Sequence, residues 1–164
     1  MDIVVAPDPH EAAGEAAAWI ARQLRNAVSR RGTATIAVSG GSTPALMLAR
    51  LAELPVPWSA TTIFQVDERL APDGDPDRNA TLLDILRSHR ASIRLMPVTA
   101  ADLKAASRRY AAQLPDRLDI VHFLEATSRA LEGPYEIALV EGSVSTPDDE
   151  RRIREIRAAG LDRD

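Results

Sequence analysis

Five consecutive small or hydroxylated residues stand between a short apolar run and a helix start, and their types suit anion binding. The run Ile36-Ala37-Val38 predicts a buried strand, and Thr43-Pro44 predicts a helix start, with Thr43 as N-cap and Pro44 at the first helical position. The glycine turn between them consists of Ser39, Gly40, Gly41, Ser42 and Thr43. Such a turn directs backbone N–H groups and the positive end of a helix dipole to one point. With its hydroxyls as further donors, it predicts a phosphate site.

This pattern specifies an anion site rather than a particular ligand. The glycine turn lacks the G-x-x-x-x-G-K-[ST] of nucleotide-binding loops and the G-x-G-x-x-G of dinucleotide-binding turns. The alternative interpretation is a tight strand-to-helix turn in which both glycines serve backbone geometry alone.

A second group of candidate residues, Asp67, Glu68 and Arg69, follows the predicted strand 61–66. In parallel α/β sheets, ligands bind at the carboxyl ends of the strands, so these charges are candidates for ligand contacts. The alternative is a solvated loop or a local ion pair. His10 and His89 fall near predicted helix ends, where we expect surface positions.

Strand and helix patterns alternate along the chain, which predicts an α/β fold with a mostly parallel sheet covered by helices on both faces. The predicted strands are 3–6, 36–38, 61–66, 93–96, 118–122 and 136–140. The predicted helices are 9–31, 43–53, 76–90, 99–114, 125–131 and 147–160. Asp8 and Asp75 are the predicted N-caps of the first and third helices, each followed by proline.

The amino-acid composition excludes several classes of function. The 164 residues suit one domain, and with 4% aromatic residues the core must consist of Ala, Leu, Ile and Val. A net charge of −4 argues against a nucleic-acid surface. No apolar run approaches the ~18 residues of a membrane span, and we expect a cytoplasmic protein without membrane contact. The absence of cysteine excludes disulfides, thiol nucleophiles and thiolate metal sites, and we expect neither a metal nor a cofactor.

Residues 1–118 resemble the N-terminal part of the 6-phosphogluconolactonase family. The resemblance is carried by Ser39–Pro44, Pro57-Trp58, Val66–Arg69, and Asp75-Pro76-Asp77 followed by Asn79. The related glucosamine-6-phosphate deaminases share the glycine turn but usually carry Asp-Glu-Tyr at 67–69, so Arg69 favours the lactonase.

The resemblance implies a Rossmann-like α/β fold and metal-free hydrolysis of 6-phosphogluconolactone to 6-phosphogluconate in the pentose phosphate pathway. It implies that the glycine turn, Asp67 and Glu68 bind the sugar phosphate. It also implies that Arg69 binds substrate and stabilises negative charge, since a cation directed at a developing oxyanion contributes strongly to ester hydrolysis.

The chain departs from this family after the strand 118–121. The family continues with a Gly-x-Gly-x-Asp-Gly-His-Thr segment, whose histidine is the general base, whereas this chain continues with His122-Phe123-Leu124. His122 ends the corresponding strand and is the candidate substitute; the alternative is a packed or partly exposed strand-end histidine. The general base therefore stays unassigned, and we expect ligand binding rather than turnover.

Residues 118–159 resemble a fragment of the small subunit of nickel–iron hydrogenases, on Leu118–Phe123 and Gly133–Thr146. In that family the Glu-Gly-Ser turn, here 141–143, lies near a [4Fe–4S] cluster held by cysteines, which this chain lacks. We expect a lactonase-like part, 1–117, joined near Arg117-Leu118 to a tail, 118–164, that can complete the same sheet. A gene fusion and an assembly artefact would both produce this join.

Three functions are therefore open. The chain is a 6-phosphogluconolactonase by descent, a catalytically inactive sugar-phosphate-binding module, or a redox-complex fragment that associates with a hydrogenase large subunit. Hydrolysis of the lactone separates the first from the second, and capture of a stoichiometric large subunit would identify the third.

Overall fold

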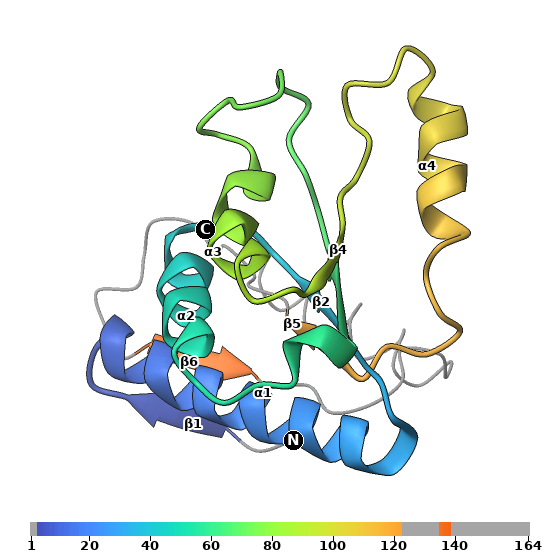
Figure 1. Cartoon of the computed structure of the whole chain (residues 1–164). Coiled ribbons are helices and arrows are strands. Elements are labelled where there is room, and N and C mark those ends of the chain that lie inside the picture. Colours follow the sequence, from blue (N-terminus) through green and yellow to red (C-terminus); the bar gives the residue numbers. More distant parts are fainter. Residues whose placement is uncertain (1–2, 123–134, 139–164) are drawn as a thin grey trace.

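The computed structural model describes residues 3–122 and 135–138 (Figure 1). The strands are β1 (Ile3–Ala6), β2 (Ala34–Val38), β3 (Thr61–Gln65), β4 (Ser92–Arg94), β5 (Ile120–His122) and β6 (Tyr135–Ala138). The α-helices are α1 (Pro9–Arg31), α2 (Ser42–Ala52), α3 (Asp84–Arg87) and α4 (Leu103–Ala111). Two 3-10 helices, η1 (Trp58–Ala60) and η2 (Asn79–Leu83), precede β3 and α3. In this part of the chain, no helix combines the length and apolar character that a membrane span requires.

A parallel sheet forms the centre of the fold and confirms the predicted α/β class. Its strand order is β4-β3-β2-β5. In the register, Ile36 of β2 lies between Ile63 of β3 and Ile120 of β5. All four strands run in one direction, so the ends of β2, β3 and β5 meet at one edge, which carries the glycine turn.

Helices cover both faces of this sheet, as predicted. Ile36, Ile63 and Ile120 point to the face covered by α1 and α2, where alanines allow the helices to approach closely. The alternate residues Ala37 and Phe64 point to the opposite face, where they pack against α4. Figure 1 shows α1 and α2 on one side of the sheet and α4 on the other.

Of the N-caps predicted for the first two helices, the structure confirms Asp8 and contradicts Thr43. Asp8 is the predicted N-cap of α1: its carboxylate accepts hydrogen bonds from the amides of His10 and Glu11 at 2.8 and 2.9 Å. The predicted Thr43 cap of α2 is wrong, because the helix begins at Ser42 with Gly41 as N-cap. Gly41 has a φ of 114°, a conformation open to glycine, and this turns the chain into the helix two residues earlier than the predicted cap.

The predicted helix over 76–90 is wrong in length and in its start. Only η2 and the short α3 form there. Asp75 accepts a hydrogen bond from the amide of Asp77, which closes a turn instead of capping a helix. The amides of Asn79 and Ala80 donate to the distant carboxylate of Glu68. This tertiary contact overrides the local helix pattern.

The first strand also lies outside the parallel sheet. β1 pairs with β6 in a separate antiparallel pair, with Ile3 opposite Ala138. A local pattern marks a strand but does not specify its partner, which is why alternation placed β1 wrongly. The segments expected at 125–131, 141–145 and 147–160 lie outside the described residues.

Asp119 ties the segment after the predicted join to the front of the chain. Its carboxylate accepts hydrogen bonds from the amide and hydroxyl of Thr35 at 2.8 and 3.2 Å and forms an ion pair with Arg31. Its own amide donates to the carbonyl of Thr35 at 3.2 Å. β5 therefore enters the sheet in register with β2, and whether residues 118–164 form a separate unit stays a prediction.

We expect Asp119→Ala to lower the free energy of unfolding by roughly 1–2 kcal/mol, because the amide of Thr35 loses its acceptor. Chemical denaturation measures this change. Asp116→Ala is the matched control at an exposed aspartate three residues earlier. Equal stability of the two variants would contradict the role of Asp119.

Candidate functional site

The glycine turn lies at the carboxyl end of β2, as predicted. Gly41 and Ser42 are exposed to solvent. Among the described residues no side chain caps α2. The first amides of a helix have no partner within the helix, so those of α2 are directed outward at the positive end of its dipole. This geometry suits an anion, and phosphate binding stays a prediction.

Ser39 and His122 contact each other on the buried side of the glycine turn. Both are buried, and the amide of Ser39 donates to the carbonyl of His122 at 3.2 Å. The Ser39 hydroxyl lies 3.4 Å from Nδ1 of His122. Burial lowers the pKa of His122, so the imidazole is neutral near pH 7. The structure thus holds His122 as a packed strand-end residue in contact with the turn.

Glu68 is the best-connected residue of the predicted Asp67–Arg69 loop. Its side chain is 0% exposed and forms an ion pair of 3.1 Å with Nε of Arg78, which is itself buried. Its carboxylate accepts hydrogen bonds of 2.7–3.0 Å from the amides of Arg69, Asn79 and Ala80 and from Nε2 of Gln65. Its acceptor positions are engaged within the chain, so Glu68 holds the loop in this structure, and its predicted contact with a ligand stays a prediction.

The pKa of Glu68 reflects the same contacts. Burial raises this pKa, but the hydrogen bonds from Gln65, Arg69, Arg78 and Asn79 outweigh the burial and leave the pKa below its ordinary value. The carboxylate therefore stays ionised at neutral pH, as its buried partner Arg78 requires.

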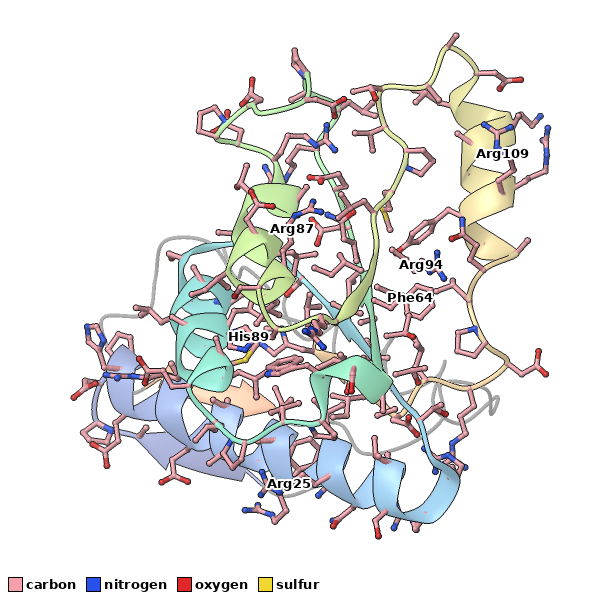
Figure 2. The ribbon with its side chains drawn as sticks, in the orientation of Figure 1. Arg25, Phe64, Arg87, His89, Arg94 and Arg109 are labelled. Atoms are coloured by element: carbon pink, nitrogen blue, oxygen red, sulfur yellow. The ribbon has the colours of Figure 1, made fainter. Side chains whose placement is uncertain are left out.

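Gln65 bonds directly to Glu68 of the Asp67–Arg69 loop, and Tyr110 bonds to Gln65. Neither residue was predicted from the sequence. The Gln65 side chain accepts a hydrogen bond from the amide of Met96 at 2.7 Å while donating to Glu68. The Tyr110 hydroxyl accepts from the amide of Gln65 at 2.8 Å and contacts its carbonyl at 3.0 Å. The Tyr110 ring meets Phe64 edge-on, and Figure 2 places Phe64 between the sheet and α4. A glutamine at a strand end carries no local sequence signal for this role.

Asn79 joins the loop to the glycine turn. Its Nδ2 donates to the carboxylate and the carbonyl of Asp67 at 3.0 and 3.2 Å. A Cβ added to Gly40 would lie 1.7 Å from Oδ1 of Asn79, so the carboxamide lies directly against the turn. The structure therefore brings the two predicted groups, 39–43 and 67–69, to one edge of the sheet.

Arg69 is the free cation of this assembly. It is exposed, its amide is fixed by Glu68 at 2.8 Å, and its guanidinium has no hydrogen-bond or ion-pair partner among the described residues. The other histidines lie elsewhere: His10 is exposed on α1, and His89 packs against Trp58 with ring centroids 5.7 Å apart (Figure 2).

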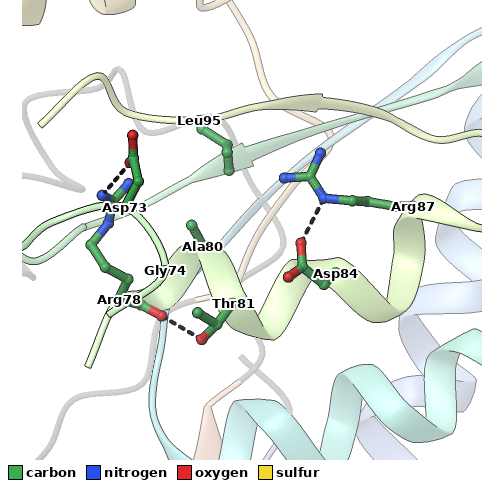
Figure 3. A pocket seen from close by; sticks show the side chains of 8 residues that line it. All are labelled: Asp73, Gly74, Arg78, Ala80, Thr81, Asp84, Arg87 and Leu95. Atoms are coloured by element: carbon green, nitrogen blue, oxygen red, sulfur yellow. Dashed lines mark hydrogen bonds and ion pairs between the residues drawn. The ribbon is translucent and has the colours of Figure 1, made fainter. Parts of the chain in front are cut away.

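A cleft of about 350 Å³ lies between the turn at 73–74, η2, α3 and Leu95, which follows β4 (Figure 3). Its cations are already neutralised, since Arg78 pairs with Asp73 at 2.9 Å and Arg87 pairs with Asp84 at 2.6 Å. These pairs make the cleft a weaker anion site than the glycine turn.

Comparison with known proteins identifies relatives of the front of the chain. Residues 7–130 match the family model described as glucosamine-6-phosphate isomerases/6-phosphogluconolactonase. The chain is 34% identical over 122 residues to a 6-phosphogluconolactonase of Mesorhizobium japonicum, covering 70% of this chain and 51% of that protein. It is 38% identical over 102 residues to one of Pseudomonas aeruginosa, covering 61% of this chain and 42% of that protein.

The fold has the same relatives. The crystal structure of a 6-phosphogluconolactonase from Shewanella baltica superposes with a TM-score of 0.64 at 30% identity, over 70% of this chain and 52% of that one. This confirms the predicted Rossmann-like fold class. The chain spans about half the length of the relatives that it matches. These comparisons give no support to the hydrogenase resemblance, which rests largely on residues outside the described part and stays a prediction.

The buried His122 makes stability sensitive to mild acid. Its pKa is lower in the folded than in the unfolded chain, so the unfolded chain binds more protons below about pH 6.5, and stability falls as the pH falls. We expect His122→Gln to flatten the slope of unfolding free energy between about pH 7.5 and 5.5, by at most about 1.4 kcal/mol per pH unit.

Urea denaturation across this pH range measures that slope. His10→Gln, which makes the same substitution at an exposed histidine of α1, is the matched comparison variant. A wild-type slope in the His122→Gln variant would show that the imidazole is not held neutral by the fold.

Proposed function

Because the chain belongs to the family of glucosamine-6-phosphate isomerases and 6-phosphogluconolactonases, we propose that it binds 6-phosphogluconolactone or 6-phosphogluconate at the glycine turn. The relatives to which it is similar are named 6-phosphogluconolactonases. The observation that carries the proposal is the meeting of the turn and the Asp67–Arg69 loop through Asn79. Both elements follow parallel strands, where α/β sheets bind ligands.

The glycine turn supplies the phosphate subsite in this proposal. The amides at the start of α2 and the hydroxyls of Ser42 and Thr43 are the donors. A helix N-terminus binds phosphate well because its amides and its dipole act on the same point. Ser39 supports the turn from inside, since its hydroxyl faces His122.

The Asp67–Arg69 loop supplies the sugar-acid subsite. The guanidinium of Arg69 has no partner among residues 3–122 and 135–138, and its fork of donors suits a carboxylate or a lactone oxygen. Asp67 is exposed beside it and can accept hydrogen bonds from sugar hydroxyls. Glu68 holds the loop in place and touches no ligand in this proposal.

Lactone hydrolysis is the second candidate function, favoured by Arg69. In this reaction a water oxygen bonds to the carbonyl carbon, the ring C–O bond breaks, and the leaving alkoxide takes a proton. Arg69 can stabilise the oxyanion, but a base must lie within hydrogen-bond reach of the water. The imidazole in contact with the turn, that of His122, is buried. We therefore propose binding as the principal function.

Calorimetry with 6-phosphogluconate tests the binding proposal on the full chain. We expect a binding heat that Gly41→Val abolishes, because a side chain at φ 114° costs about 1–3 kcal/mol of strain and crowds the donors. Gly14→Ala on α1, where a Cβ meets nothing within 4 Å, is the matched control. Unchanged heat in a folded Gly41→Val variant would remove the turn from the site.

Hydrolysis of 6-phosphogluconolactone separates the two functions. Because the histidine that the described residues place in contact with the turn, His122, is buried, we expect a rate close to the spontaneous one, unchanged by His122→Ala. A clearly faster rate that falls in Arg69→Ala but not in Arg87→Ala, which lies in the cleft, would establish the enzyme instead. A removed oxyanion donor lowers such a rate by about 10²–10³-fold.

A further inference from the structure

The two glycines of the turn serve different purposes. Gly41 has a positive φ, whereas Gly40 does not. A Cβ on Gly40 would lie 1.7, 2.0 and 2.5 Å from Oδ1, Cγ and Nδ2 of Asn79. Gly40 is therefore required by the close approach of a side chain from another element, rather than by its own backbone conformation.

Asn79 is held firmly in that position. It is buried, and its amide donates to Oε1 of Glu68 at 2.7 Å, which fixes the start of η2. Its Nδ2 donates both to the carbonyl and to Oδ2 of Asp67. The donors of the carboxamide are thus directed to Asp67, and its oxygen is left to face Gly40.

We propose that Asn79 is a positioning residue that sets the spacing between the glycine turn and the Asp67–Arg69 loop. It touches Gly40 on one side and orients the carboxylate of Asp67 on the other. The inference rests on the proposed function, in which one sugar phosphate contacts both elements. Without the carboxamide, the pairing of β2 with β3 still holds the bases of the two elements together, with the amide of Val66 donating to the carbonyl of Val38 at 2.9 Å, but Asp67 loses its side-chain link to the turn at Gly40.

The substitution Asn79→Asp keeps the shape of the side chain but changes its hydrogen-bonding capacity. An ionised carboxylate would face that of Asp67 and repel it, whereas a protonated one would again donate. We expect Asn79→Asp to weaken the affinity for 6-phosphogluconate about tenfold near pH 7.5 and to recover most of it near pH 5. A merely structural role predicts no such pH-dependent recovery relative to the wild type.

A double-mutant cycle tests the contact itself without a ligand. We expect Gly40→Ala to lower the thermal unfolding temperature clearly in the presence of Asn79, and much less in combination with Asn79→Ala. Asn26→Ala, at an exposed position on α1, replaces Asn79→Ala in the control cycle and gives additive effects. An additive cycle for Gly40 and Asn79 would contradict the close contact.

Calorimetry then separates this inference from the function on which it rests. If the wild-type chain binds 6-phosphogluconate and a folded Asn79→Ala variant binds it equally well, the positioning role is wrong and the proposed function stands. If the wild-type chain gives no heat, the proposed function fails, and the ligand-positioning role fails with it even where the cycle shows coupling. Weaker binding in Asn79→Ala with pH-dependent recovery in Asn79→Asp supports both.

Discussion

The buried carboxylate of Glu68 is the constraint on which this site depends. Its ion pair with Arg78 and its bonds to the amides of Asn79 and Ala80 close the single loop of residues 66–78, between β3 and η2, against the start of η2. Removing one partner of such a pair costs about 3–5 kcal/mol, because the other is left as an uncompensated buried charge. The pair therefore fixes the two ends of this loop against each other.

Two further residues connect the Glu68 carboxylate to the rest of the site. Gln65 connects it to the sheet, where Tyr110 and Met96 bond the same glutamine. Asn79 connects it to the glycine turn. Arg69, whose amide is fixed and whose guanidinium has no partner in the described part of the chain, is left at the edge of this framework. Among the described residues, the unpaired guanidinium of Arg69 and the first backbone amides of α2 lie at the same edge of the sheet, and both suit an anionic ligand.

Much of the fold was predictable from local pattern. The alternation of strands and helices gave the parallel sheet and its two covered faces, and Asp8 gave the start of α1. Two of the errors share one cause, which is that a group distant in sequence overrides a local signal, whereas the wrong Thr43 cap follows from the local conformation of Gly41. Glu68 prevents a regular helix at 76–83, and β6 takes β1 away from the parallel sheet. The positions of the turn and the loop at strand ends were predictable, and their role in ligand binding stays a prediction; the links through Gln65 and Asn79 depend on contacts that no local pattern encodes.

In the proposed function, the glycine turn and the Asp67–Arg69 loop form one anion site. A ¹⁵N NMR titration of the full chain with 6-phosphogluconate tests this most directly, because each backbone amide reports separately. We expect the largest shifts at Gly41, Ser42 and Thr43, with smaller ones at Arg69 and none at Arg87 in the cleft. Shifts centred on Arg87, or an unchanged glycine turn at saturating ligand, would contradict the account.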